Sequence, residues 1–224
     1  MRNVLKEIWK YVLNKKLLGV CAGDDAIAIN TTKWLIEKGA DVNAADKYGN
    51  TALMKACVKG RTDIAEFLIE KGADIDTKGE FGYTALMKAC VKGHTDVARF
   101  LIERDADINA KDDNGWTALM WACANGHTDV ARLLIEKGAD INAKDRSGRT
   151  AMDYSMLDSK NKAVQKVLSD TFKRSEAPHL TQTLSGLEEK DNRESESAYA
   201  LSGEYARGND ISVSVANRAL RNGR

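Results

Sequence analysis

The chain of 224 residues carries 34 Lys and Arg against 33 Asp and Glu, and 43% of its residues are hydrophobic. A net charge near zero gives no general reason to expect nucleic acid or an anionic membrane as a partner. The sequence has no run of 18 uncharged apolar residues, so no transmembrane helix is predicted.

Residues 3–14 are predicted to form an amphipathic helix that packs on the body of the protein. The apolar residues of this segment recur at helical spacing: Val4, Leu5, Ile8, Trp9, Val12 and Leu13. Lys6, Glu7 and Lys10 lie on the other side of that helix. These charges, followed by Lys15 and Lys16, interrupt the apolar region that a signal peptide needs. We therefore expect a cytoplasmic location.

From residue 34 onward the sequence repeats with an offset of 33. The first block, TALMKAC and its variant TALMWAC, occupies 51–57, 84–90 and 117–123, and Thr150 begins a further copy. The second block, FLIEKGAD and its variants, occupies 34–41, 67–74, 100–107 and 133–140. Two blocks in the same register over several copies indicate a repeat architecture.

Each unit is predicted to contain a turn, a helix, a second turn and a second helix. In the first full copy, Gly49 supplies the turn, Thr51 caps the first helix and Gly60 ends it. Thr62 caps the second helix, and Gly72 ends it. The side chains predicted to point inward are Leu53, Met54, Ala56, Cys57, Ile64, Ala65, Leu68 and Ile69. One pair of helices cannot bury its own apolar side, so neighbouring units must stack.

The period divides the chain into successive segments. The N-terminal helix takes residues 1–14, and a degenerate first unit, with a longer link between its helices, takes 15–48. Three full units follow at 49–81, 82–114 and 115–147, and 148–172 forms a C-terminal capping unit. Beyond it, 173–224 mix Ser, Gly, Asn, Glu and Arg with scattered apolar residues. We expect this last segment to be a largely disordered tail.

The pattern resembles the ankyrin-repeat family. The segments 39–44 (GADVNA) and 138–143 (GADINA) match the sequence with which that family leaves its second helix. The resemblance covers residues 15–172 and implies an all-α solenoid of stacked helix-turn-helix units with turn tips projecting to one side. It also implies that tips and first helices line a concave groove in which partners bind.

The sequence departs from the family pattern at three kinds of position. Ala follows each capping Thr where the family favours Pro, and Met54, Met87 and Met120 replace the His of its helix start. Asp105 replaces the Gly that ends a second helix. Asp tolerates the left-handed backbone conformation better than most residues do, but at some cost.

Positions that differ between the units carry the specific information, because repetition accounts for the scaffold. Aromatic side chains at exposed turns are predicted to anchor an interface. Lysines at i, i+4 spacing on two neighbouring first helices form a positive strip beside them. The proposed partner-binding residues are Tyr48, Lys55, Lys59, Phe81, Tyr83, Lys88, Lys92, Trp116, Trp121, Asn125 and Arg149. We expect a protein partner that presents an acidic and apolar motif.

Two alternatives stay open at this point. The aromatic side chains could lie across neighbouring tips and stiffen them, with the lysines keeping the groove soluble. Nucleic acid could bind instead, with bases on the aromatic rings and phosphates on the lysines, although the near-neutral charge counts against it. The sequence contains no motif of a hydrolase, a phosphate-binding loop, a dinucleotide site or a zinc protease. We predict a monomeric, non-catalytic module without a cofactor or a membrane partner.

Cysteine and histidine also recur with the period. Cys57, Cys90 and Cys123 are 33 residues apart, and stacked helices lie about 8–10 Å apart, which is too far for a disulfide or a shared zinc ion. We therefore expect small buried thiols. His94 and His127 are equivalent as well, and an arginine takes their place in the preceding unit, so a structural role is predicted for them.

Overall fold

The computed structural model describes residues 2–23, 27–157 and 161–173. The chain divides into two compact units after Asp170, and the second, Thr171–Arg224, is described only at 171–173. The expected tail at 173–224 therefore lies outside the described residues except at its first position, and so does part of the expected capping unit.

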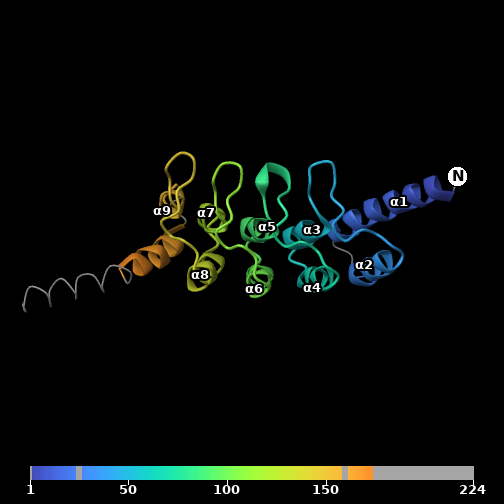
Figure 1. Ribbon diagram of the computed structural model, residues 1–224. Coiled ribbons are helices and arrows are strands. Elements are labelled where there is room, and N and C mark those ends of the chain that lie inside the picture. The colour runs from blue at the N-terminus through green and yellow to red at the C-terminus, as the bar shows by residue number, and fades with distance from the viewer. Residues whose placement is uncertain (1, 24–26, 158–160, 174–224) are drawn as a thin grey trace, which may run out of the picture. The chain divides into compact units, whose positions relative to one another are not determined.

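The helices of the first compact unit form two rows (Figure 1). The first row contains α1 (Arg2–Ala22), α3 (Ala52–Val58), α5 (Ala85–Lys92), α7 (Ala118–Ala124) and α9 (Ala151–Ser155). The second row contains α2 (Ala28–Glu37), α4 (Thr62–Glu70), α6 (Thr95–Glu103) and α8 (Thr128–Glu136), and residues 162–170 are helical too. Helices contact their neighbours along each row, and α1 to α8 also pair across the rows.

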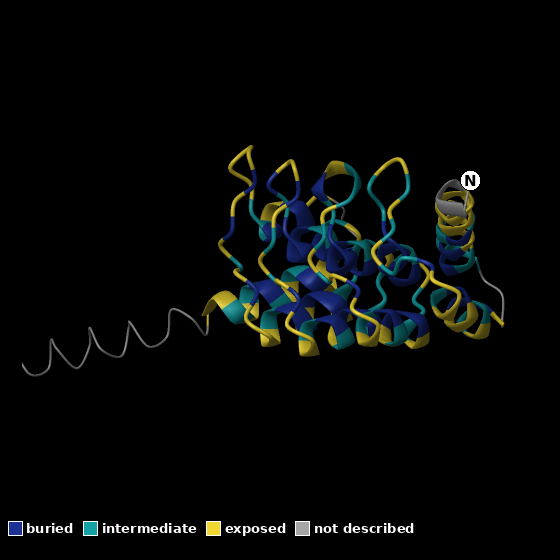
Figure 2. Ribbon diagram, turned by 45° about the vertical axis from the view of Figure 1, so that its right-hand side comes forward, coloured by how far each residue is buried: buried dark blue, intermediate teal, exposed yellow. Residues whose placement is uncertain are grey.

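The loops between repeats project beyond the first row of helices (Figure 1). We call them the tips; one of them contains the short 3-10 helix η1 (Glu80–Gly82). The predicted all-α solenoid with tips on one side is confirmed. Figure 2 shows that exposed residues gather at the ends of the tips, whereas buried residues lie where the helices face one another.

Apolar residues at equivalent positions form columns through the stack. In the second row, successive helices contribute leucines that are at most 1% exposed: Leu35, Leu68, Leu101 and Leu134. The first row contributes Leu53, Leu86 and Leu119, which are equally buried. The inward side chains predicted for the first full unit are buried, except for the half-buried Ile69. Each unit therefore completes the core of its neighbours.

Threonine side chains cap the first helices as predicted. Thr51 Oγ1 accepts a hydrogen bond from the Met54 N–H at 3.3 Å, and Thr84 and Thr117 accept the equivalent bonds at 3.3 and 3.4 Å. At α9, Thr150 forms a capping box, in which its own N–H also donates to a side chain of the first turn. The repeated threonine thus marks the start of each of these helices.

The prediction that Thr62 caps the second helix is wrong. Arg61 is the N-cap residue of α4, Thr62 is the first helical residue, and no side chain caps this end. Gly60 adopts φ +69°, and the chain turns so tightly there that the Thr62 N–H donates to the Gly60 carbonyl at 3.2 Å. The backbone therefore satisfies a donor that a side-chain cap does not reach.

The N-terminal helix is longer than expected, and its first half is less covered. α1 continues to Ala22 and so includes the first helix of the degenerate unit. Its buried residues recur at four-residue spacing and are at most 1% exposed: Leu13, Leu17 and Cys21. The predicted packing of residues 3–14 on the body is confirmed at Leu13 but is wrong for the first half of α1, which extends beyond α2 and α3 (Figure 1). The residues left exposed there, by 65, 55 and 56%, are Leu5, Ile8 and Trp9.

Replacing Asp105 with glycine is expected to raise the free energy of unfolding by about 1 kcal/mol. Asp105 adopts φ +64°, whereas glycine takes the equivalent left-handed position after the other second helices. Urea denaturation followed by circular dichroism measures the gain. Gly72→Asp is the matched reverse change: a Cβ there meets no atom within 4 Å, so only the backbone conformation opposes it. Equal stability of both variants and the wild type contradicts the prediction.

Candidate protein-binding surface

Aspartates at the start of three tips connect them to the first-row helix that follows each tip. The donor in each case lies nine residues after the aspartate. We call these contacts the tip–helix pairs: Asp46 Oδ2 with Lys55 Nζ at 2.7 Å, Asp112 Oδ2 with Trp121 Nε1 at 3.0 Å, and Asp145 Oδ2 with the Tyr154 hydroxyl. The position nine residues after the aspartate can thus hold a lysine, a tryptophan or a tyrosine as the hydrogen-bond donor.

The second oxygen of each aspartate orders the backbone of its tip. Asp46 Oδ1 accepts hydrogen bonds from the N–H groups of Tyr48 and Asn50 at 2.9 and 3.0 Å, and the other two aspartates bind their tips in the same way. Partial burial raises the pKa of Asp46, but the hydrogen bonds from Lys55 and these two N–H groups outweigh it, so the pKa lies below its ordinary value. The carboxylate is ionised at neutral pH.

The tip before α5 lacks a tip–helix pair. Gly79 stands where the aspartate is expected, 33 residues after Asp46. Lys88 follows nine residues later, makes no ion pair with any described residue, and places Nζ 4.4 Å from the centroid of the Tyr83 ring. Burial lowers the pKa of Lys88 from its ordinary value, although a nearby glutamate opposes this effect. An aromatic face rather than a carboxylate stabilises this half-buried cation.

Four aromatic rings from successive units contact one another. The ring centroids lie 5.1 Å apart for Tyr83 and Trp121, 4.3 Å for Trp121 and Trp116, and 3.9 Å for Trp116 and Tyr154. We call this set the aromatic stack. Three of its members were candidate binding residues. Tyr154 was not, although its position 33 residues after Trp121 is a signal that could have identified it.

Two aromatic candidates lie outside this stack and are exposed. Tyr48 is 51% exposed, with Lys47 Nζ 4.7 Å from its ring centroid. Phe81, at the equivalent position of the next tip, is 63% exposed. The structure therefore separates the aromatic candidates into an exposed pair and three half-buried rings.

Three further candidates lie on a tip or at the end of a first-row helix. Asn125 Nδ2 donates to the Trp121 carbonyl at 2.8 Å, at the end of α7. Arg149 is exposed, with its guanidinium carbon 5.9 Å from the Tyr154 ring centroid. Lys92 is exposed in the last turn of α5. None of the three lies in the pocket described next.

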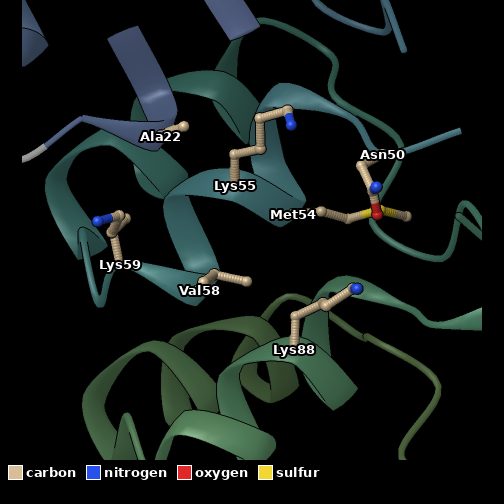
Figure 3. Close-up of a pocket in the computed structure, with 7 residues that line it drawn as sticks. All are labelled: Ala22, Asn50, Met54, Lys55, Val58, Lys59 and Lys88. Carbon is tan, nitrogen blue, oxygen red and sulfur yellow. The ribbon is translucent and has the colours of Figure 1, made fainter. Parts of the chain in front are cut away.

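Three candidate lysines meet at a pocket between α1, α3 and α5 (Figure 3). It has a volume of about 210 Å³, and we call it the lysine pocket; its lining residues are Ala22, Asn50, Met54, Lys55, Val58, Lys59 and Lys88. The lysines surround it, and Met54 and Val58 give it an apolar wall (Figure 3). The sequence pattern identified the lysines but not the apolar residues between them.

A family model described as "Ankyrin repeats (3 copies)" matches the chain at residues 18–112, 73–145 and 109–175. These overlapping matches cover more than half of the chain and coincide with the stacked helix pairs. The chain belongs to the ankyrin-repeat family. No curated protein matches it at significant similarity.

Ankyrin repeats are in general protein–protein interaction modules, and proteins built from them are typically non-catalytic scaffolds. The candidate residues occupy the tips and first helices of these repeats. No helix among residues 2–23, 27–157 and 161–173 is long and apolar enough to cross a lipid bilayer. The same residues contain no group of three His, Cys, Asp or Glu side chains that could bind a metal ion.

The histidines of the ankyrin repeats connect neighbouring units. His94 Nε2 lies 3.0 Å from the Val58 carbonyl, and His127 Nε2 lies 3.1 Å from the Val91 carbonyl. Because a carbonyl oxygen only accepts, Nε2 carries the proton in both rings. Asn161 Nδ2 makes a similar bond, at 3.1 Å, to the end of α7. These contacts support the structural role predicted for the histidines.

The four cysteines of the ankyrin repeats are free and buried, as expected for the three in register. Burial raises the pKa of the Cys21 thiol to about 11 and that of Cys123 to about 12. It also raises the pKa of the thiols of Cys57 and Cys90. Protonated, inaccessible thiols are poor nucleophiles, so these side chains contribute to packing.

Proposed function

We propose that this ankyrin-repeat protein is a non-catalytic module that binds a protein partner through its tips and first helices. The proposal rests on one observation: Tyr48 and Phe81 are exposed on the two neighbouring tips whose units line the lysine pocket. Exposed aromatic side chains are common anchors of protein interfaces. An apolar wall flanked by lysines suits a partner segment that combines apolar and acidic residues.

The backbone of Phe81 provides further support. Phe81 adopts φ +59° and ψ +22°, a left-handed conformation that bulky residues rarely adopt. Its exposed side chain gains little from packing in return. The Phe81 carbonyl accepts a hydrogen bond from the Asp113 N–H at 3.0 Å, so the next unit fixes this backbone. Strained residues that the surroundings fix in place cluster at binding sites.

The half-buried aromatic candidates contribute in a different way. Trp121 of α7 contacts both Tyr83 and Trp116, so the two tips that carry Tyr83 and Trp116 are ordered before a partner arrives. An ordered surface loses less conformational entropy on binding. We retain all eleven candidates as the proposed contact set, with Tyr48 and Phe81 as its anchors and the lysines as its charged contacts.

We also propose that the protein works in a reducing compartment such as the cytoplasm. All four cysteines are free, and proteins of oxidising compartments commonly use such residues in disulfides. The equivalent thiols lie on successive stacked helices, where no pair of them serves as a disulfide.

Replacing Phe81 with glycine is expected to weaken partner binding by about tenfold or more. The same change is expected to raise the free energy of unfolding by about 1 kcal/mol. The variant loses an exposed anchor and the backbone strain together, so affinity and stability move in opposite directions. Proteins captured by the full chain from native cells are quantified by mass spectrometry, and calorimetry then measures the affinity of one purified partner.

Trp34→Ala is the matched control for this experiment. Trp34 is 47% exposed but belongs to α2 in the second row of helices, so its loss is expected to leave affinity unchanged. Full binding by both Phe81→Gly and Tyr48→Ala contradicts the proposed surface. Retardation of labelled single-stranded RNA at low salt, lost when Lys55 and Lys88 are replaced, favours the nucleic-acid alternative instead.

A further inference from the structure

The tip before α5 differs from the other tips in a way that leaves one charge without a carboxylate. Three tips form a tip–helix pair, in which a tip aspartate accepts from the side chain nine residues later. Nine residues after Gly79 the side chain is still a lysine, Lys88, but Gly79 supplies no carboxylate. The repeat thus preserves the cation and lacks the anion.

The space beside Gly79 is limited by the preceding unit. A Cβ on Gly79 lies 2.8 Å from Met54 Sδ and 3.0 Å from Asn50 Oδ1. The backbone of Gly79 has φ −94°, which any residue can adopt, so crowding rather than strain opposes a larger residue. The two nearest atoms are at the ends of flexible side chains of the lysine pocket, and the third, the Gly49 carbonyl oxygen at 3.2 Å, belongs to the backbone of the preceding tip.

A second polar atom of the lysine pocket also lacks a partner. Asn50 Oδ1 is buried and accepts no hydrogen bond, although buried acceptors are nearly always satisfied. Lys88 extends from α5 towards the side of the pocket where Asn50 and Met54 lie (Figure 3). Lys55, in contrast, already pairs with Asp46 at 2.7 Å. The pocket therefore presents one unpaired cation beside an apolar wall, whereas the unsatisfied acceptor is itself buried.

We propose that an Asp or Glu side chain of the protein partner enters the lysine pocket and pairs with Lys88. The inference rests on the proposed function and names the chemistry that the partner brings to it. The incoming carboxylate takes the role that Asp46, Asp112 and Asp145 have in their own tips. An adjacent apolar side chain of the same partner segment packs on Met54 and Val58.

The surroundings of Lys88 favour an anion at this site. Burial is the main cause of its lowered pKa, and the positive charge of Lys55 adds to it, whereas Glu80 and Asp46 oppose the shift without contacting Lys88. A carboxylate that pairs directly with Lys88 stabilises its charged form, whereas a neutral or basic segment does not. Hydrogen bonds to charged groups are also stronger than those between neutral groups.

The test selects peptides from a random displayed library on the full-length protein. The peptide enriched most strongly is synthesised with its Asp and Glu residues and with Asn and Gln in their place, and calorimetry measures both affinities. We expect an acidic peptide that binds about tenfold or more tightly than its amide form. Lys88→Met is expected to remove that difference.

Gly79→Asp provides a second variant, because it supplies the carboxylate from within the chain. We expect it to pair with Lys88 and to weaken the acidic peptide about tenfold or more. Lys137→Met, which removes an exposed lysine at the end of α8, is the matched control and is expected to leave affinity unchanged.

A library that yields no peptide dependent on Lys88 overturns the inference, as does equal affinity for the acidic and amide forms. If the selected peptides do not depend on Lys88 but lose affinity for Phe81→Gly, the proposed binding surface stands without the carboxylate contact. If the selected peptides bind Phe81→Gly and Tyr48→Ala as tightly as the wild type, the proposed surface fails as well. The two failures are therefore distinguishable.

Discussion

Replacing Trp121 with alanine is expected to lower the free energy of unfolding by about 3 kcal/mol. The indole contacts Tyr83 and Trp116, with ring centroids 5.1 and 4.3 Å away, and donates to Asp112 at 3.0 Å. Asp112 is only 6% exposed, so the truncation also leaves a buried carboxylate oxygen without its donor. Urea denaturation followed by circular dichroism measures the loss.

Trp121→Lys separates the two contributions. A lysine at this position is expected to pair with Asp112 as Lys55 pairs with Asp46, so this variant loses the ring contacts but retains the tip–helix pair. It should therefore be more stable than Trp121→Ala by about 1–3 kcal/mol. A loss below about 1 kcal/mol in Trp121→Ala contradicts a stabilising role of the aromatic stack. Partner affinities of Trp121 variants have to be measured below the temperature at which they unfold.

Replacing Leu101 with alanine is expected to destabilise the protein by about 3 kcal/mol and to split its unfolding into two steps. Leu101 is fully buried in α6 and belongs to the leucine column of the second row. α6 contacts α4 on one side and α8 on the other. The cavity therefore weakens the connection between the two ends of the stack. Hydrogen exchange in α4 and α8 at intermediate urea concentrations measures whether the two sides unfold separately.

Leu157→Ala is the matched control for this variant. Leu157 is 72% exposed, so the same truncation there is expected to change stability by less than about 0.5 kcal/mol. Simultaneous loss of protection in α4 and α8 of the Leu101→Ala variant argues against independent halves. If Leu101→Ala lowers the free energy of unfolding no more than Leu157→Ala does, the leucine column has no role in stability.

The offset of 33 residues was enough to predict the stacked helix pairs, because apolar side chains that recur with this period are buried only when neighbouring units stack. The capping threonines could be predicted for the same reason. The N-terminal helix shows where this reasoning ends. Leu5, Ile8 and Trp9 have the spacing of a helix face, but spacing does not reveal whether another element covers that face. The structure leaves it exposed.

The candidate surface was predictable in its location more than in its details. Tyr83 and Trp116 vary at the same tip position, and their partial burial depends on rings contributed by neighbouring units. Phe81 carries no signal in the sequence for its left-handed backbone, which follows from the geometry of its tip. The absence of a carboxylate at Gly79, in contrast, can be read from alignment of the repeats.

Among the residues that the structure describes, the hydrogen bonds between ankyrin repeats connect adjacent units, as the contact from His94 to the Val58 carbonyl illustrates. Under tension, the repeats of such a stack unfold one at a time. A unit of 33 residues spans about 110 Å when extended but adds only about 10 Å to the stack. Each repeat that unfolds under force therefore lengthens the molecule by about 100 Å. The repeats that remain folded keep their structure and their part of the binding surface.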